Sequence, residues 1–215
     1  MAAIVNNISE ILDDSTSIVF GDYFDQNIEK VIWSNSLTSI VFGWCFNRNI
    51  DKVIWPNSLT SITFGHYFNQ NIEKVIWPNS LTSIVFGYCF NQRIEKVLWP
   101  TSLTSIAFGC YFNQNIEKVT LPNSLTSITF GFRFDQSIEK VLWPNSMTSI
   151  IFGYNFNQKI INLPIYLLYL TIHTNYKNND DIDKKYLYQI KQIDNNNKEL
   201  IIFQRITGTL TKRAC

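Results

Sequence analysis

The chain has 215 residues, of which 46% are hydrophobic and 15% aromatic, so its composition is not that of a disordered protein and allows a sizeable core. Its 18 basic and 17 acidic residues nearly cancel, which gives no global attraction toward nucleic acid or an anionic membrane. The longest apolar stretch is too short to span a bilayer, and the N-terminus lacks the basic and apolar regions of a signal peptide.

Residues 1–15 precede the first repeat and are predicted to form an N-terminal cap. A repeat stack with an open end would expose its core and a sheet edge, so a polar cap is needed there. The segment "NISEILDD" is compatible with one short capping helix.

Residues 16–172 repeat with a period of 22, which indicates a solenoid of about seven turns. Twenty-two residues suffice for one coil turn with two short strands and two corners, but not for a helical hairpin or a propeller blade. Within each turn, segments such as 83–86 and 96–99 alternate in polarity and are rich in β-branched and aromatic residues, which predicts two short strands per turn. The glycines that mark the period are Gly21, Gly43, Gly65, Gly87, Gly109, Gly131 and Gly153.

Stacking the copies places equivalent side chains in columns. Two phenylalanine columns, an isoleucine column and a tryptophan column that passes through Leu121 are predicted to form the core. The asparagine column that follows the second phenylalanine is expected to be a buried ladder in which each amide satisfies backbone groups; a solvated loop is the alternative. Glu-Lys or Asp-Lys pairs in each copy are expected to form a solvated, self-neutralised face.

Residues 173–215 are predicted to be a small α/β C-terminal cap, with a partly disordered extension as the alternative. The segment "DKKYLYQIKQI" is expected to be a helix with apolar residues on one side, and "LIIFQRI" a strand.

The elements "PNSLTSI", "FG" and "FNQ-x-I" resemble the FNIP repeat, a family known mainly from social amoebae and the giant viruses that infect amoebae. The repeat is also similar to leucine-rich repeats that contain "LP-x-S-L-T-S-I". These resemblances imply an all-β, leucine-rich-repeat-like solenoid, and a location in the cytoplasm, or in the host-cell cytoplasm if the source is viral. Relatives often carry an N-terminal F-box, and fewer than 20 residues precede the first repeat here, so an F-box does not fit in the given sequence.

No motif carries a recognisable reaction, so we expect a non-enzyme with no catalytic residues, no cofactor and no metal site. Cys45 and Cys89 lie two repeats apart, roughly 10 Å at strand spacing, and are expected to be free thiols. A pairing of Cys89 with His66 as nucleophile and base is disfavoured, because no carboxylate occupies a third place.

Two variable columns are candidates for protein binding. The first comprises the two positions after each glycine; its candidate residues are Tyr23, Trp44, His66, Tyr67, Tyr88, Tyr111, Phe132, Arg133 and Tyr154. The second lies opposite the inward side chains of the second predicted strand; its candidate residues are Ile32, Ile54, Ile76, Leu98 and Leu142. Tyrosine and tryptophan are frequent in protein-binding hot spots, and an exposed apolar stripe usually marks an interface. The competing interpretation is packing: the first column would tuck into a corner of the turn, and the C-terminal tail would cover the second.

The sequence therefore predicts a non-enzymatic protein–protein interaction module, and the family resemblance suggests target recognition without an F-box. A structural or self-associating repeat protein, pairing through the solenoid ends or the stripe, is the alternative. The partner is expected to be a protein, and neither nucleic acid nor a membrane is expected.

Overall fold

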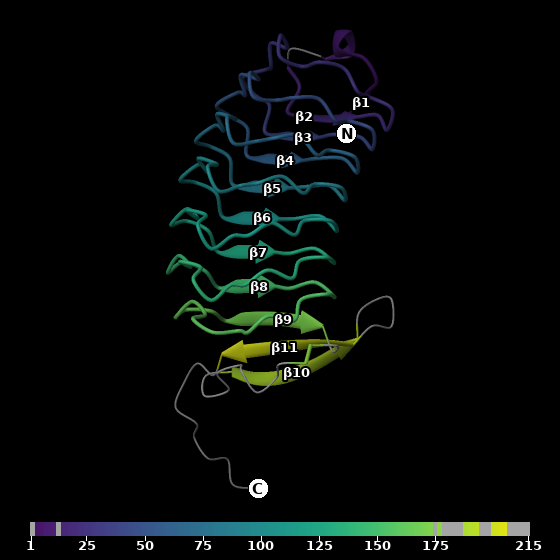
Figure 1. Ribbon diagram of the computed structural model, residues 1–215. Helices are drawn as coiled ribbons and strands as arrows, with labels where there is room; N and C mark the ends of the chain where they lie inside the picture. The colour runs from purple at the N-terminus through teal and green to yellow at the C-terminus, as the bar shows by residue number, and fades with distance from the viewer. Residues whose placement is uncertain (1–2, 12–13, 174–175, 178–186, 194–198, 206–215) are drawn as a thin grey trace, which may run out of the picture.

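The computed structural model describes residues 3–11, 14–173, 176–177, 187–193 and 199–205. Over these residues the chain winds into a solenoid in which each turn adds a strand to one 11-stranded sheet (Figure 1). Nine strands are parallel and follow chain order: β1 (Ala3–Val5), β2 (Ser17–Phe20), β3 (Ser39–Val41), β4 (Ser61–Thr63), β5 (Ser83–Val85), β6 (Ser105–Ala107), β7 (Ser127–Thr129), β8 (Ser149–Ile151) and β9 (Tyr169–His173). The predicted leucine-rich-repeat-like β-solenoid is confirmed.

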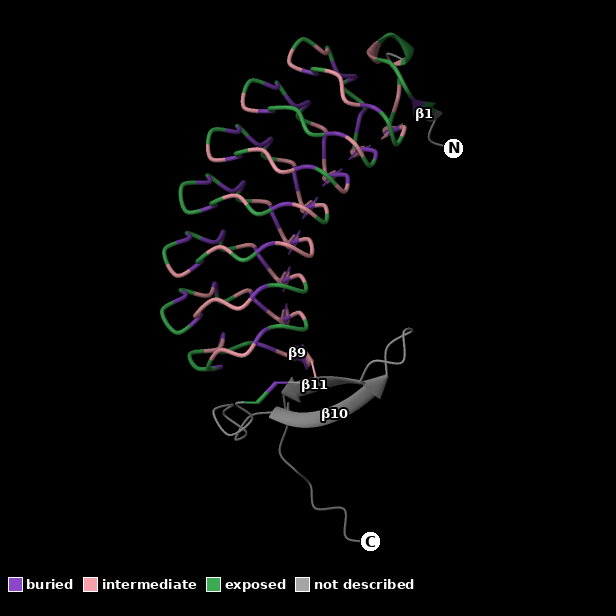
Figure 2. Ribbon diagram, turned by 45° about the vertical axis from the view of Figure 1, so that its right-hand side comes forward, coloured by how far each residue is buried: buried purple, intermediate pink, exposed green. Residues whose placement is uncertain are grey.

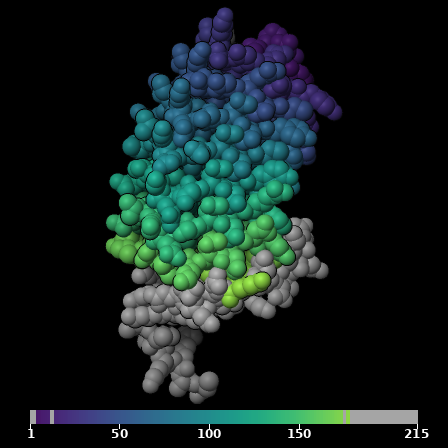
Figure 3. Space-filling model, viewed as in Figure 1, coloured from purple at the N-terminus to yellow at the C-terminus, as the bar shows by residue number. Residues whose placement is uncertain are grey.

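The strands pair in the register that the period requires. Ser39 pairs with Ser61, Ser61 with Ser83, and so on to β8, each step being 22 residues. The last turn is two residues shorter, because Ser149 pairs with Tyr169. Equivalent side chains therefore lie above one another along the stack, and the space-filling view shows the turns as successive bands (Figure 3).

The core consists of the predicted columns. In each turn from β2 to β8, the strand isoleucine and the phenylalanine before the glycine point inward, as Ile84 and Phe86 do at 0% and 3% exposure. Neighbouring rings of the strand phenylalanines are stacked, with 5.5 Å between the centroids of Phe86 and Phe108. Across the core the first four of these rings each meet a tryptophan edge-on, as Phe86 meets Trp99 at 6.5 Å between centroids. A single turn cannot bury these rings alone, so each turn is completed by its neighbours.

Each turn contains one strand, not the predicted two. The segments that end in tryptophan, such as residues 74–77, contain no strand. In that part of the turn the described backbone bonds stay within the turn, as in the one from the Val75 N–H to the Ile72 carbonyl. A ladder needs strands about 4.8 Å apart, and the centroids of Trp55 and Trp77 are 6.4 Å apart. The turns therefore fan out on the tryptophan side, and the strands line the concave side of the arc (Figure 2).

The recurring glycine marks a close approach of backbones. A Cβ built on Gly87 would overlap the carbonyl oxygen of Gly65, and the same holds for each glycine from Gly43 to Gly153 and the glycine one turn earlier. Only a residue without a side chain fits there. The corner after each strand is thus fixed by backbone packing.

Polar side chains form ladders at the corners. Asn91 Oδ1 accepts the backbone N–H of Asn113 at 2.9 Å, and the equivalent bond recurs from Asp25 onward to Lys177. Serine and threonine form two further ladders, in which Ser80 Oγ donates to the Leu59 carbonyl and Thr82 Oγ1 to the Thr60 carbonyl. The asparagine ladder was predicted correctly, but its predicted burial is wrong, because Asn91 and Asn113 are exposed.

The ends of the solenoid differ from the helices predicted there. At the N-terminal end, β1 extends the parallel sheet, and only a short 3-10 helix, η1 (Ile8–Glu10), follows it. At the other end, β11 (Glu199–Arg205) pairs antiparallel with β9, and β10 (Leu187–Ile193) pairs with β11. The predicted strand is confirmed and the predicted helix is wrong over residues 187–193; its first residues, 183–186, lie outside the described residues.

Candidate protein-binding surfaces

The first candidate column lies where the carboxyl ends of the parallel strands meet one lateral edge of the arc. We call it the aromatic edge; it comprises the two residues after each glycine, from Asp22 and Tyr23 to Tyr154 and Asn155. The predicted candidates are exposed or half-buried: Tyr23 is 92% exposed, Trp44 51% and Phe132 43%. Backbone bonds hold this edge in register, as the Tyr111 N–H donates to the Tyr88 carbonyl at 2.9 Å.

Rings along the aromatic edge stack on one another in two runs. His66 lies between Trp44 and Tyr88, with centroid distances of 4.4 and 4.6 Å and nearly parallel planes. Further along, Phe132 stacks on Tyr154 at 5.0 Å.

Between the two runs, Cys110 takes the place of a ring. Contact with the Cys110 thiol is the main cause that raises the pKa of Tyr88. The Arg133 guanidinium lies 4.0 Å over the Tyr111 ring, a cation–π contact beside this interruption.

The second candidate column lies across the core from the strands and so on the convex side. We call it the aliphatic stripe; it comprises Ile32, Ile54, Ile76, Leu98 and Leu142. These side chains are 81–92% exposed, whereas the valine and tryptophan on either side of each point inward. The predicted outward direction of this column is confirmed. Thr120 interrupts it between Leu98 and Leu142.

Comparison with known proteins identifies the family of the 22-residue repeat. A family described as FNIP Repeat matches residues 24–67, 68–111, 112–155 and 134–175, which cover most of the chain. The chain belongs to the FNIP repeat family. No curated protein matches it in sequence.

A similar solved structure is that of CroV588, a giant-virus protein described as a novel circular LRR protein. It is 34% identical, with a TM-score of 0.44, and the match covers 79% of this chain and 35% of that chain. The chain therefore spans about a third of the length of CroV588.

The FNIP turn also contains a polar partner that the sequence interpretation missed. The glutamine after each ladder asparagine reaches back to the previous turn, where Gln114 Nε2 donates to both the carbonyl and Oδ1 of Asn91. The recurrence of "FNQ" was the available signal. In the second copy, Arg48 replaces this glutamine and forms an ion pair of 2.8 Å with Asp25.

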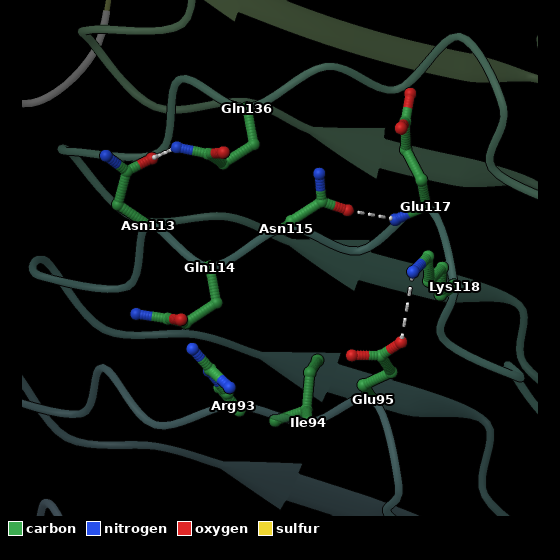
Figure 4. A pocket seen from close by; sticks show the side chains of 9 residues that line it. All are labelled: Arg93, Ile94, Glu95, Asn113, Gln114, Asn115, Glu117, Lys118 and Gln136. Atoms are coloured by element: carbon green, nitrogen blue, oxygen red, sulfur yellow. Dashed lines mark hydrogen bonds and ion pairs between the residues drawn. The ribbon is translucent and has the colours of Figure 1, made fainter.

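A shallow polar pocket lies on this corner of the FNIP turns (Figure 4). Arg93 occupies a position that is asparagine in most other turns. There the asparagine side chain accepts a backbone N–H of the following bend, as Asn115 accepts the Glu117 N–H at 2.8 Å. Glu95 and Lys118 line the pocket and form a long, exposed ion pair of 3.9 Å. The groups are mostly paired with one another, which agrees with a solvated structural face.

The described residues contain no cluster of three or more His, Cys, Asp or Glu side chains that could hold a metal ion. Cys45, Cys89 and Cys110 are free thiols, as predicted for the first two, and Cys215 lies outside the described residues. Burial raises the pKa of the Cys89 thiol, which disfavours the thiolate that a nucleophile requires. In the described part of the chain, no helix is long and apolar enough to cross a membrane.

Proposed function

We propose that this FNIP solenoid is a non-enzymatic protein-interaction module and that the aliphatic stripe is its main partner-binding surface. The observation that carries this proposal is the exposure of Ile32, Ile54, Ile76, Leu98 and Leu142. These side chains are held in one column by in-register turns and fill no space in the core. Burying an exposed aliphatic side chain of this size is worth roughly 1.5–3 kcal/mol, so several in a row provide a strong driving force for association.

Charges beside the stripe indicate the chemistry of the partner. A lysine lies two residues before each stripe position, as Lys74 precedes Ile76, and these lysines are exposed. Each lysine lies in the exposed bend just before the stripe position of its turn, so a lysine column runs beside the stripe. An acidic residue directly precedes each of these lysines, so a partner with an apolar ridge flanked by residues of both charges would complement this surface.

The test is affinity capture from the native host cell followed by mass spectrometry. The bait is the full chain, and the matched bait carries Ile54→Lys, Ile76→Lys and Leu98→Lys. We expect partners to be retained by the first bait and lost from the second, with both baits melting at the same temperature because these side chains touch no core. Equal capture by the two baits would contradict the proposal for the stripe.

Thr120→Ile sharpens this test, because it completes the stripe without changing any charge. We expect it to retain the same partners at least as well as the unmodified chain.

A further inference from the structure

The aromatic edge is self-complementary when it is read in the opposite direction. Its second positions run Tyr23, Cys45, Tyr67, Cys89, Tyr111 and Arg133 over six turns. Reversed and laid against itself, this series sets each ring against a small residue or a cation: Tyr23 faces Arg133, Cys45 faces Tyr111, and Tyr67 faces Cys89.

The first residue after each glycine can be paired in the same register. Trp44, the largest side chain of the edge, would face Cys110, where the ring stack is interrupted, and His66 would face Tyr88. Asp22 would face Phe132, the residue beside Arg133, so opposite charges lie diagonally across the interface. Neither Asp22 nor Arg133 has an ion-pair partner among the described residues, and both are exposed.

Other antiparallel registers lose this match. In the proposed register, ring faces ring only at the axis, where His66 meets Tyr88. A shift of one turn either way also sets tyrosine against tyrosine at the second positions, at Tyr67 with Tyr111 in one direction and at Tyr23 with Tyr111 in the other. Trp44 then meets Phe132 or Tyr88 in place of Cys110. Size and charge therefore select the register in which the first turn faces the sixth.

We propose that the chain forms a two-fold symmetric homodimer through the aromatic edge. The two-fold axis passes between His66 and Tyr88, along the radius of the arc. Rotation about that axis reverses the order of the turns but keeps the centre of curvature on the same side, so the two curved edges follow each other along their length. The arrows of the parallel strands all point to one side of the stack (Figure 1), and the aromatic edge follows their carboxyl ends, so it lies on a lateral face where this geometry is available.

The available surface suits a dimer of standard size. Tyr23 is 92% exposed, and Trp44, Tyr67, Tyr88 and Phe132 are 43–51% exposed. At roughly 200 Å² for a large aromatic side chain, these five supply on the order of 500 Å². A standard interface buries about 800 Å² per partner, and the cysteines, His66, Tyr111 and Arg133 provide further area.

Sedimentation equilibrium of the full chain tests the dimer. We expect a mass near 50 kDa, twice the 25.1 kDa of one chain. Trp44→Ala should raise the dissociation constant about thirtyfold, as truncation of an aromatic anchor does, and Tyr23→Ala, at the end of the interface, should raise it less, about fivefold. Tyr23 is almost fully exposed, so its variant should fold normally. A monomer at about 100 μM would overturn the proposal.

A charge swap tests the register. Asp22→Arg and Arg133→Asp should each weaken the dimer about tenfold, and the chain with both changes should regain most of the affinity, because the opposite charges are restored across the axis. A double variant as weak as the singles would overturn this register.

Ile76→Lys, in the aliphatic stripe, is the control and should leave the dimer unchanged. The inference does not rest on the proposed function, since the stripe lies on another face. Loss of partner capture with an intact dimer contradicts only the stripe, and a monomer that still captures its partner contradicts only the dimer.

Discussion

The two long sides of each turn are held together in different ways. On the strand side, backbone bonds join neighbouring turns from the threonine before the strand to the corner after the glycine, as in the bonds from Thr82 N–H to Thr60 and from Cys89 N–H to His66. On the tryptophan side, neighbouring turns touch through stacked rings such as Trp55 and Trp77. A backbone ladder fixes the distance between neighbouring turns near 4.8 Å, whereas stacked rings allow a larger distance. The arc therefore curves toward the strands.

The last turn shows what this difference permits. Three residues lie between Ile160 and Pro164, whereas five lie between Ile138 and Pro144, so the two missing residues come from the tryptophan side. Asn162 absorbs the shorter path with a left-handed backbone, at φ 56°, and its side chain donates to the Glu139 carbonyl. The strand of that turn still pairs in register. Register is therefore set by the strand side, and the tryptophan side accommodates change.

The largest expected effect comes from the strand side. Gly87→Ala would drive a Cβ into the Gly65 carbonyl, and neither backbone can move without breaking the ladder. We expect a loss of about 4 kcal/mol or more in the free energy of unfolding, measured by urea denaturation. Ile76→Ala, on an exposed position, is the control and should change stability little; equal effects would show that the glycine corner is not close-packed.

Substitution of a buried tryptophan should destabilise the fold less than substitution of a buried phenylalanine near the strand. Trp77→Leu loses ring packing, but it also removes a buried indole N–H for which the described residues offer no hydrogen-bond partner. Leu121 already occupies this column in another turn. We expect a loss of about 2 kcal/mol, against about 4 kcal/mol for Phe90→Ala, in the same denaturation experiment. The reverse order would contradict the contrast between the two sides.

Removing one step of the asparagine ladder should have a smaller effect. Asn91→Ala leaves the Asn113 N–H without its acceptor, while the Gln114 amide keeps the Asn91 carbonyl and loses only the Oδ1 acceptor. Asn113 is exposed to water, so we expect about 1 kcal/mol, read from the shift of the thermal midpoint. Asn91→Asp keeps the acceptor oxygen, as Asp25 and Asp135 do in other turns, and should restore most of the stability.

The smallest effect concerns the charged face. The Ser137 hydroxyl, which donates to the Glu117 carboxylate at 2.7 Å, is the main cause that lowers the pKa of Glu117. A lowered pKa stabilises the fold above the unfolded-state pKa near 4.3 and ceases to do so as pH falls through the folded-state value. Glu117→Gln should therefore flatten the dependence of the melting temperature on pH slightly below pH 5. An identical dependence in both chains would show that this bond contributes nothing.

The period, the core columns and the outward direction of the candidate columns could be read from the sequence, because in-phase repetition places Phe86 above Phe64 and Ile76 above Ile54. The sequence could not show that the second predicted strand of each turn is absent. The segment at 74–77 has strand propensity, and only the three-dimensional spacing of the turns prevents a ladder there. Residues 187–193 were predicted as a helix from apolar spacing, but β11 covers the edge of β9 and leaves its own edge open, and residues 187–193 pair with that edge as a strand. Whether either exposed column binds a partner stays a prediction.

Deleting one whole turn tests most directly whether equivalent side chains stack in register. Removal of residues 88–109 takes out one period of 22 and joins Gly87 to Cys110, so every column stays in phase. Removal of residues 88–108 takes out one residue fewer and shifts every later column by one position. The account predicts that the first chain melts cooperatively and that small-angle scattering shows it about 5 Å shorter, while the second fails to fold. Equal behaviour of the two deletions would contradict the in-register stack.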